Sequence, residues 1–399
     1  MVPRARRICD PAVVRPAGRY SHRPGHAQRT DVQLLLAAGT PALSSDRLPS
    51  VVPELATGLA AVAARSAGQL GPWTGRISAL AELDNAFSAT GLQTYAACPH
   101  SYLLGKVLRI RDQDEPDDEE ASPLDIGVVV HEALEAFFRS HAGRSPDAAW
   151  IQAEHAAAHD VLDGFAANLA AEGKAGRPLV WANRLRQMHR GLRGTLLADD
   201  SYRRERRARP QKTELGFGLD DPAQPAVELQ LPSGRTVSLR GSIDRVDVRD
   251  DGGLIVLDWT TGRSKDYKEL AGDTPDLVGG GRHLQLPLYA EAAIAWYGQP
   301  ADVDAFYVLV EQGAQRRGGA VDHEQRARLH EALDTLSGAA SGGLFPMNPG
   351  EDGFFGWENC RYCPFDRLCP SSRGTQWEHV RSDPALAGYL AVTEPVTAP

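Results

Sequence analysis

Three of the five cysteines in this 399-residue chain, Cys360, Cys363 and Cys369, fall within ten residues of one another. Five cysteines in a chain of this length are far too few for a disulfide-stabilised scaffold. The spacing Cys-x2-Cys-x5-Cys instead brings three thiols onto one short loop, which lets their sulfur atoms converge on a soft metal centre. The alternative, three free cysteines in a hydrophobic core, is disfavoured by the polar neighbours Arg361 and Asp366.

A fourth ligand is needed to complete such a centre. Cys98 is the candidate, because the remaining cysteine, Cys9, lies in a start of the chain that has no hydrophobic period. Four thiolates from opposite ends of a domain fit either Zn²⁺ or an iron–sulfur cluster, and the spacing alone does not choose between them.

The distribution of apolar residues divides the chain into four parts. Residues 1–30, rich in arginine, are expected to be disordered, and the alanine-rich runs within residues 31–85 predict a helical connector. A folded domain is predicted for residues 86–372, and a tail for residues 373–399. No run approaches the ~20 apolar residues of a membrane span, and no secretory signal is seen, so a cytoplasmic protein is expected.

Within the predicted domain, the hydropathy period changes from helical to strand-like at Pro210. Helices are expected before this point, at 126–138 and between 146 and 209. After it, five short runs predict a β-meander: 214–219, 227–231, 236–239, 242–248 and 254–258. A helix at 284–296, a strand at 305–310 and a helix at 322–336 complete a mixed α/β core flanked by helices.

The formal net charge of −9 argues only weakly against nucleic acid, because the charges are segregated along the chain. Seven carboxylates between Asp112 and Glu120 predict a solvated loop. Between Arg177 and Lys212, eleven Lys and Arg residues face only three acids, which indicates either an ordinary exposed helix face or a phosphate-binding surface. The candidates for nucleic-acid binding are Arg184, Arg186, Arg190, Arg193, Arg203 and Arg204.

Two acids stand at strand positions of the predicted sheet, Asp244 in Gly-Ser-Ile-Asp-Arg-Val-Asp and Asp258 at the end of Leu-Ile-Val-Leu-Asp. Such an acid is costly to bury unless a cation, a donor or a metal compensates it. Two of them on adjacent strands indicate a shared divalent ion, for which carboxylate oxygens favour Mg²⁺ or Mn²⁺. His131 could complete the set, although a lone histidine on an apolar helix face is often structural. Arg245 and Asp247 are expected to pair at the sheet surface.

Six motifs occur in a characteristic order. They are Ser-Ala-Thr-Gly-Leu-Gln-Thr-Tyr-Ala-Ala-Cys-Pro at 88–99, Gly-x3-His-x2-Leu-Glu at 127–135, Gly-Ser-Ile-Asp-Arg-Val-Asp at 241–247, Asp-x-Thr-Thr-Gly at 258–262, Gln-Leu-Pro-Leu-Tyr at 285–289 and the C-terminal cysteines. Over about residues 86–372 the chain thus resembles the PD-(D/E)XK nuclease domain of the RecB and AddB helicase–nuclease class. The resemblance implies a restriction-endonuclease-like mixed sheet flanked by helices, with an iron–sulfur cluster joining the N- and C-terminal parts of the domain.

The resemblance also implies roles for individual residues. The catalytic Mg²⁺ or Mn²⁺ would be bound by His131, Asp244, Asp258 and the backbone carbonyl of Trp259. A [4Fe-4S] cluster would be bound by Cys98, Cys360, Cys363 and Cys369. Gln285 and Tyr289 would line the site and touch the DNA strand, and Glu214 is a further acid that could lie near the metal.

One position departs from the family pattern. The third motif of the family is Asp-x-Lys-Thr-Gly, whose lysine neutralises charge at the attacking water or the scissile phosphate, and this chain has Thr260 there. Threonine is neutral and short. Lys265 or Lys268 could take over the role only if the turn after Gly262 folds back toward the site.

The resemblance implies a metal-dependent DNA exonuclease that cleaves single strands or DNA ends in recombination or repair, with a site altered by Thr260. Two alternatives stay open: a catalytically inactive module that holds DNA, and a zinc-containing structural domain that docks a helicase. No Gly-x4-Gly-Lys-Ser/Thr sequence is present, so a partner helicase subunit is expected to supply the motor.

Overall fold

A computed structural model describes residues 53–80, 86–111, 119–219, 221, 223–272, 276–298, 300 and 302–394. The predicted disordered start (1–30) and most of the predicted acidic loop lie outside the described residues. Of the predicted connector, the structure describes helix α2 (Pro53–Ser66) and the segment up to residue 80. Among the helices described, none is long and apolar enough to cross a membrane.

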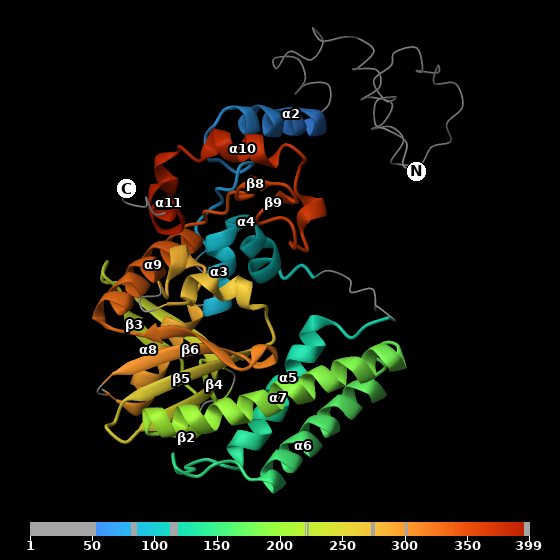
Figure 1. Ribbon diagram of the computed structural model, residues 1–399. Coiled ribbons are helices and arrows are strands. Elements are labelled where there is room, and N and C mark those ends of the chain that lie inside the picture. Colours follow the sequence, from blue (N-terminus) through green and yellow to red (C-terminus); the bar gives the residue numbers. More distant parts are fainter. Residues whose placement is uncertain are drawn as a thin grey trace.

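Seven strands of the described chain form one mixed sheet at the centre of the molecule (Figure 1). Its main order is β1 (Ala86–Ser88), β4 (Thr236–Arg249), β5 (Leu254–Thr260), β6 (Val303–Leu309) and β7 (Gln315–Ala320). The pairs β1–β4 and β5–β6 are parallel, and the pairs β4–β5 and β6–β7 are antiparallel. The predicted mixed α/β core is therefore confirmed.

Strand β4 is one continuous strand of 14 residues, where the sequence predicted two. The predicted break between the two strands fell at Gly241. This position has no room for a side chain, because a Cβ there would lie 2.9 Å from Cζ of Phe217 and 3.1 Å from Cε1 of Tyr289. The predicted meander is also wrong. Strands β2 (Ala208–Phe217) and β3 (Val227–Gln230) both pair antiparallel with β4, because β4 is long enough to hold them one after the other.

Strand β5 separates two hydrophobic clusters within the described chain. Its alternate side chains point to opposite faces, as in any strand: Leu254 and Val256 enter one cluster, and Ile255, Leu257 and Trp259 enter the other. The whole run Leu254–Trp259 is buried, as expected for a strand covered on both faces.

Helices cover both faces of the sheet (Figure 1). The cluster that contains Trp259 is closed by three helices: α5 (Pro123–Arg139), α6 (Gln152–Ala171) and α7 (Pro178–Arg206). The other cluster is closed by α3 (Ala89–Ala97), α8 (Gln285–Tyr297) and α9 (His323–Ser341). Helix α5 begins with the N-cap Ser122, whose hydroxyl accepts from the Asp125 backbone N–H, and its amphipathic face packs on the sheet.

The segment 373–399, for which the sequence predicted only a tail, contains helices α10 (Arg373–Val380) and α11 (Ala387–Thr393). Trp377 and Tyr389 of these helices are almost fully buried in the cluster around α3. The Tyr389 hydroxyl donates to the carbonyl of Ala96 at 2.7 Å and accepts from the Asn348 amide at 3.0 Å. These helices are thus part of the packing of the sheet domain.

Candidate active site

Asp244 and Asp258 lie opposite each other on the antiparallel strands β4 and β5, directly after the last registered pair, Arg245 with Leu257. Both side chains are buried, with 6% of each residue exposed. An Asp244 carboxylate oxygen accepts from the Trp259 backbone N–H at 2.6 Å and lies 3.3 Å from Nδ1 of His131. The Asp244 carboxylate is therefore contacted both by His131 of helix α5 and by the Trp259 backbone N–H of strand β5.

The electrostatics of the acids favour a cation. Burial, together with the nearby carboxylates of Asp244 and Glu214, raises the pKa of Asp258 well above its usual range. Burial and Asp244 likewise raise the pKa of Glu214, whose side chain accepts from the Ser242 hydroxyl at 2.6 Å. Burial lowers the pKa of His131, but the hydrogen bond to Asp244, the negative charges of Asp244 and Glu214 and the hydrogen bond to the Trp259 backbone together outweigh burial, so the pKa is raised overall. Acids that repel one another in a buried place are stabilised by a positive ion.

The chemistry of these donors fits a hard divalent cation. Two buried carboxylates and an imidazole converge with the backbone of Trp259, which also forms a hydrogen bond with His131. In the part of the chain that the structure describes, no three His, Cys, Asp or Glu side chains are already arranged as a metal ligand set. The donors nearest to such an arrangement are Asp244, Asp258 and His131, which meet around the backbone of Trp259.

Gln285 connects Asp258 to two tyrosines. Its amide nitrogen donates to Asp258 Oδ1 at 3.0 Å and to the Tyr289 hydroxyl at 3.2 Å, and its amide oxygen accepts from the Tyr307 hydroxyl at 3.1 Å. Helix α8 places Gln285 and Tyr289 one turn apart, so both reach the sheet from the same side. The sequence did not indicate Tyr307, although its register partner on the neighbouring parallel strand is Asp258.

Thr260 contacts a residue that the sequence did not single out. Its hydroxyl oxygen lies 3.0 Å from the hydroxyl of Tyr267 and accepts from the Gly262 backbone N–H at 3.0 Å. The turn after Gly262 does fold back, as a short 3₁₀ segment at Ser264–Leu270. It brings Tyr267 to Thr260, whereas the side chains of Lys265 and Lys268 are exposed to solvent.

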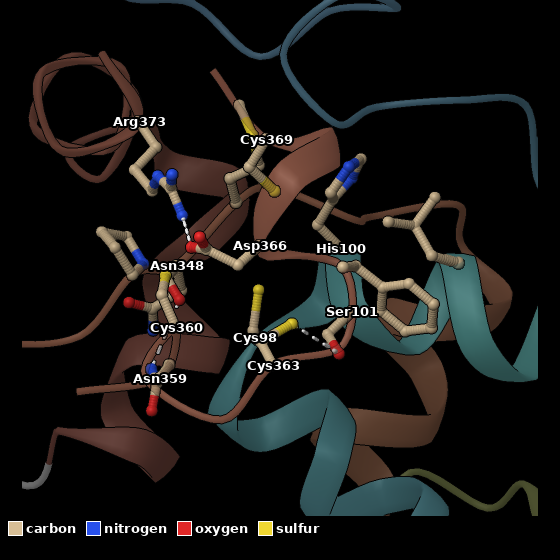
Figure 2. Close-up of a pocket in the computed structure, with 14 residues that line it drawn as sticks. Cys98, His100, Ser101, Asn348, Asn359, Cys360, Cys363, Asp366, Cys369 and Arg373 are labelled. Carbon is tan, nitrogen blue, oxygen red and sulfur yellow. Dashed lines mark hydrogen bonds and ion pairs between the residues drawn. The ribbon is translucent and has the colours of Figure 1, made fainter. Parts of the chain in front are cut away.

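The four cysteines of the folded region are free and line one pocket. Figure 2 shows Cys98, which directly precedes helix α4 (Pro99–Tyr102), facing the three cysteines of the C-terminal loop. Cys363 donates to the Ser101 hydroxyl at 3.8 Å, and Arg373 forms an ion pair with Asp366 beside them. The two ends of the domain therefore meet at the thiols.

Four sulfur donors on one pocket fit a soft metal centre by their chemistry. Burial raises the pKa of the Cys98 thiol to about 11, and burial also raises the pKa of Cys360 and Cys369. The thiols of Cys98, Cys360 and Cys369 are therefore protonated when no cation is bound, and a metal would displace their protons.

The arginines predicted to bind nucleic acid separate into two groups on α7. Arg203 is fully buried, and its guanidinium donates hydrogen bonds to Asp199, Asp200 and two backbone carbonyls. Such a group has no surface to offer a phosphate, so its assignment to a DNA-binding face is wrong. Arg184 is paired with Glu311 at 2.6 Å. The others share one helix face by their spacing: Arg186, Arg190, Arg193 and Arg204.

The predicted surface pair of Arg245 and Asp247 is buried instead. The guanidinium of Arg245 donates two hydrogen bonds to Asp247, both at 2.6 Å, and one to Asp199 at 2.8 Å. Its charge is compensated beneath α7, where it also lies 4.2 Å from the ring of Phe138. This pair is a core ion network that joins β4 to α7, because α7 covers that side of the sheet.

Comparison with curated proteins finds bacterial relatives that are named as subunits of an ATP-dependent helicase/deoxyribonuclease. The protein from Moorella thermoacetica is 28% identical over 291 residues, which are 67% of this chain and 24% of that protein. The protein from Symbiobacterium thermophilum is 30% identical over 222 residues, 52% of this chain and 17% of that protein. The chain thus matches about a quarter or less of the length of these relatives.

Two further comparisons are with a solved structure and with a family model. The crystal structure of a candidate exonuclease from Eubacterium rectale aligns with 72% of this chain and 88% of that chain, at 12% identity and a TM-score of 0.40. The family model described as the PD-(D/E)XK nuclease superfamily matches residues 86–370, which include the paired acids, the Gln285 network and the four cysteines. Since this match covers well over half of the sequence, the chain belongs to the PD-(D/E)XK nuclease superfamily.

Proposed function

We propose that this chain is a nuclease domain that hydrolyses DNA phosphodiester bonds with Mg²⁺ or Mn²⁺, acting as an exonuclease on single strands or ends in recombination or repair. The observation that carries the proposal is the buried pair Asp244 and Asp258, whose carboxylates repel each other beside His131. Membership of the superfamily adds that divalent metals serve such sites.

The metal would be held by Asp244, Asp258, His131 and the backbone carbonyl of Trp259. When bound, the ion would supply Lewis-acid stabilisation of the charge that develops on the phosphate. The Trp259 N–H fixes one Asp244 oxygen at 2.6 Å, so this carboxylate is oriented before any ion arrives.

Gln285 orients the second carboxylate. Because Tyr307 donates to its amide oxygen, the amide nitrogen must face Asp258, and a flipped amide would set two oxygens against each other. Burial raises the pKa of Tyr289 above its usual range and that of Tyr307 well above it, so both remain protonated donors at neutral pH. The three residues hold Asp258 in a fixed rotamer for catalysis.

We further propose that Cys98, Cys360, Cys363 and Cys369 hold a [4Fe-4S] cluster, with Zn²⁺ as the alternative. Their shared pocket supports this assignment. We also propose that the activity belongs to an assembly with a helicase partner in the cytoplasm, because the relatives are named as helicase/deoxyribonuclease subunits.

The test is degradation of end-labelled single-stranded DNA by anaerobically purified protein with Mg²⁺ or Mn²⁺. The wild type should release labelled nucleotides, and Asp258→Ala should lose at least about 100-fold of this rate with its fold intact. Asp160→Ala, which changes an exposed aspartate of α6, is the matched control and should leave the rate unchanged. Metal-dependent cleavage that survives in Asp258→Ala would show that the site lies elsewhere.

One observation favours a second function, namely Thr260 at the position of the motif lysine. In this alternative the chain holds DNA without cutting it. DNA binding by a wild type that leaves all substrate intact, with cleavage gained in Thr260→Lys, would establish it.

A further inference from the structure

The residue that stands in place of the motif lysine is tied into the network around Asp258. Thr260 lies two positions after Asp258 on β5, so both side chains point to the same face of the sheet. Tyr267 reaches Thr260 from the returning turn, and its ring lies 4.8 Å from that of Tyr307, measured between ring centres. Tyr307 in turn holds Gln285, which holds Asp258.

Thr260 and Tyr267 together have two hydroxyl hydrogens, and their mutual hydrogen bond uses only one of them. Thr260 also accepts from the backbone of Gly262, which consumes no hydroxyl hydrogen. Whichever residue donates within the pair, one O–H is left over, with no partner among the residues that the structure describes.

The turn is shaped to keep this arrangement. A Cβ on Gly262 would lie 3.0 Å from the Tyr267 ring and 3.1 Å from its hydroxyl, so a side chain there would push the tyrosine away from Thr260. Tyr267 itself leaves helical geometry, with φ −122° and ψ 19°, so the 3₁₀ segment is kinked at the residue that contacts Thr260. Lys265 and Lys268, on either side of it, remain in solvent.

We propose that Thr260 and Tyr267 together replace the motif lysine, and that their remaining O–H donates a hydrogen bond to the scissile phosphate. This inference rests on the proposed nuclease function. A neutral donor at this position stabilises developing negative charge less than an ammonium group does, since charge-assisted hydrogen bonds are roughly twice as strong. The site therefore works without a lysine, at a lower rate.

The test measures kcat and KM for cleavage of single-stranded DNA in Tyr267→Phe, Thr260→Val and the double variant. The residue that donates to the phosphate should cost on the order of 100-fold in kcat, and its partner, which only orients it, should cost less. KM and the affinity for DNA should stay unchanged. The double variant should be no slower than the slower single variant, because the same hydrogen bond is lost in both.

Two further variants separate this role from a structural one. Tyr297→Phe removes the hydroxyl of a half-buried tyrosine at the end of α8 and should cleave at the wild-type rate. Thr260→Lys combined with Tyr267→Phe restores a donor at the motif position and should recover kcat.

The same measurements distinguish a failure of the proposed Thr260–Tyr267 role from a failure of the proposed nuclease function. If the wild type and Asp258→Ala differ as expected but both single hydroxyl variants stay within threefold of the wild type, the pair has no catalytic role and the nuclease function stands. Additive losses in the double variant would equally contradict a shared hydrogen bond. If the wild type does not cleave, the nuclease function and this inference both fail, and cleavage gained in Thr260→Lys would assign the missing step to the lysine.

Discussion

Single residues in this molecule illustrate how burial and pairing set the charge state of carboxylates. Asp258 and Glu291 are both buried, with 6% and 3% of the residue exposed. Burial and the neighbouring acids Asp244 and Glu214 raise the pKa of Asp258. Glu291 faces Arg326, with contacts at 2.8 and 2.9 Å, and His330 at 3.0 Å. The same residue chemistry thus serves a proposed metal site in one place and a structural ion pair in the other.

The buried Glu291 carboxylate predicts that the free energy of unfolding decreases at acidic pH. Burial would raise its pKa, but the hydrogen bonds from His330 and Arg326 outweigh burial, and the pKa is lowered. A carboxyl whose pKa is lower in the folded state stabilises the fold above its unfolded value of about 4.3, and this stabilisation is lost as the pH falls through the folded value. Glu291→Gln should therefore cost roughly 1.5–3 kcal/mol at pH 7 and progressively less below pH of about 4.

Urea unfolding at pH 7, 5 and 3.5 measures this difference in the free energy of unfolding. Glu324→Gln, which alters an exposed acid on the same helix as His330, is the control and should show no difference at any pH. A constant difference between Glu291→Gln and the wild type across the three values would refute the assignment.

At the scale of elements, helix α7 divides its arginines between structure and surface. Arg203 and Arg245 make a buried network with Asp199, whose pKa is lowered because the two guanidinium groups outweigh its burial. Arg186 and Arg190 lie one turn apart on an exposed face. The sequence shows only that arginines are dense in this segment. It does not show which of them are buried against an acid, because the buried network depends on contacts between distant residues, such as the one between Asp199 and Arg245, which are 46 residues apart.

The exposed face of α7 is predicted to contact the DNA backbone. Removing two phosphate contacts in the double variant Arg186→Ala, Arg190→Ala should weaken binding and make the slope of log K against log salt shallower by roughly 1.4. Fluorescence anisotropy with labelled single-stranded DNA at several salt concentrations measures this slope. Arg328→Ala on α9, which covers the other face of the sheet, is the control; an identical slope in both variants would place the DNA elsewhere.

Other elements show how far the sequence reaches. Strand β5 and its acid were predictable, because a run of four aliphatic residues followed by Asp258 has few other interpretations. Strand β7, with the sequence Gln-Arg-Arg-Gly-Gly-Ala, carries no apolar alternation and owes its existence to pairing with β6. Tyr267 also escaped prediction, because its contact with Thr260 depends on the path of a turn rather than on a periodic pattern.

At the scale of the whole molecule, the domain is closed by contacts between its two ends. Cys98 meets the C-terminal cysteines across about 260 residues, and the Leu70 backbone donates to Asp383 at 3.2 Å. Helix α2 lies beside α10 (Figure 1). A centre bound by all four thiols would restrict the unfolded chain strongly, because it closes a very long loop.

Cys363→Ser should therefore release the metal centre and lower the melting temperature by about 5–10 °C. Iron and acid-labile sulfide per chain, or zinc if the centre is zinc, are measured alongside the thermal transition. Cys9→Ser, which changes the cysteine outside the predicted ligand set, is the control and should retain both metal and melting temperature. A Cys363→Ser protein with full metal content would exclude this residue as a ligand.

The hydrogen bond from Tyr389 to Ala96 spans 293 residues and has a consequence for synthesis on the ribosome. Helix α3 emerges well before α11, whose Tyr389 contacts it. At about 5–20 residues per second, its apolar face waits roughly 15–60 s for its partners. Throughout that interval the nascent chain lacks the Tyr389 ring that packs against Tyr95, a residue 0% exposed once folded, and this gap in the cover is open to chaperones and to neighbouring chains.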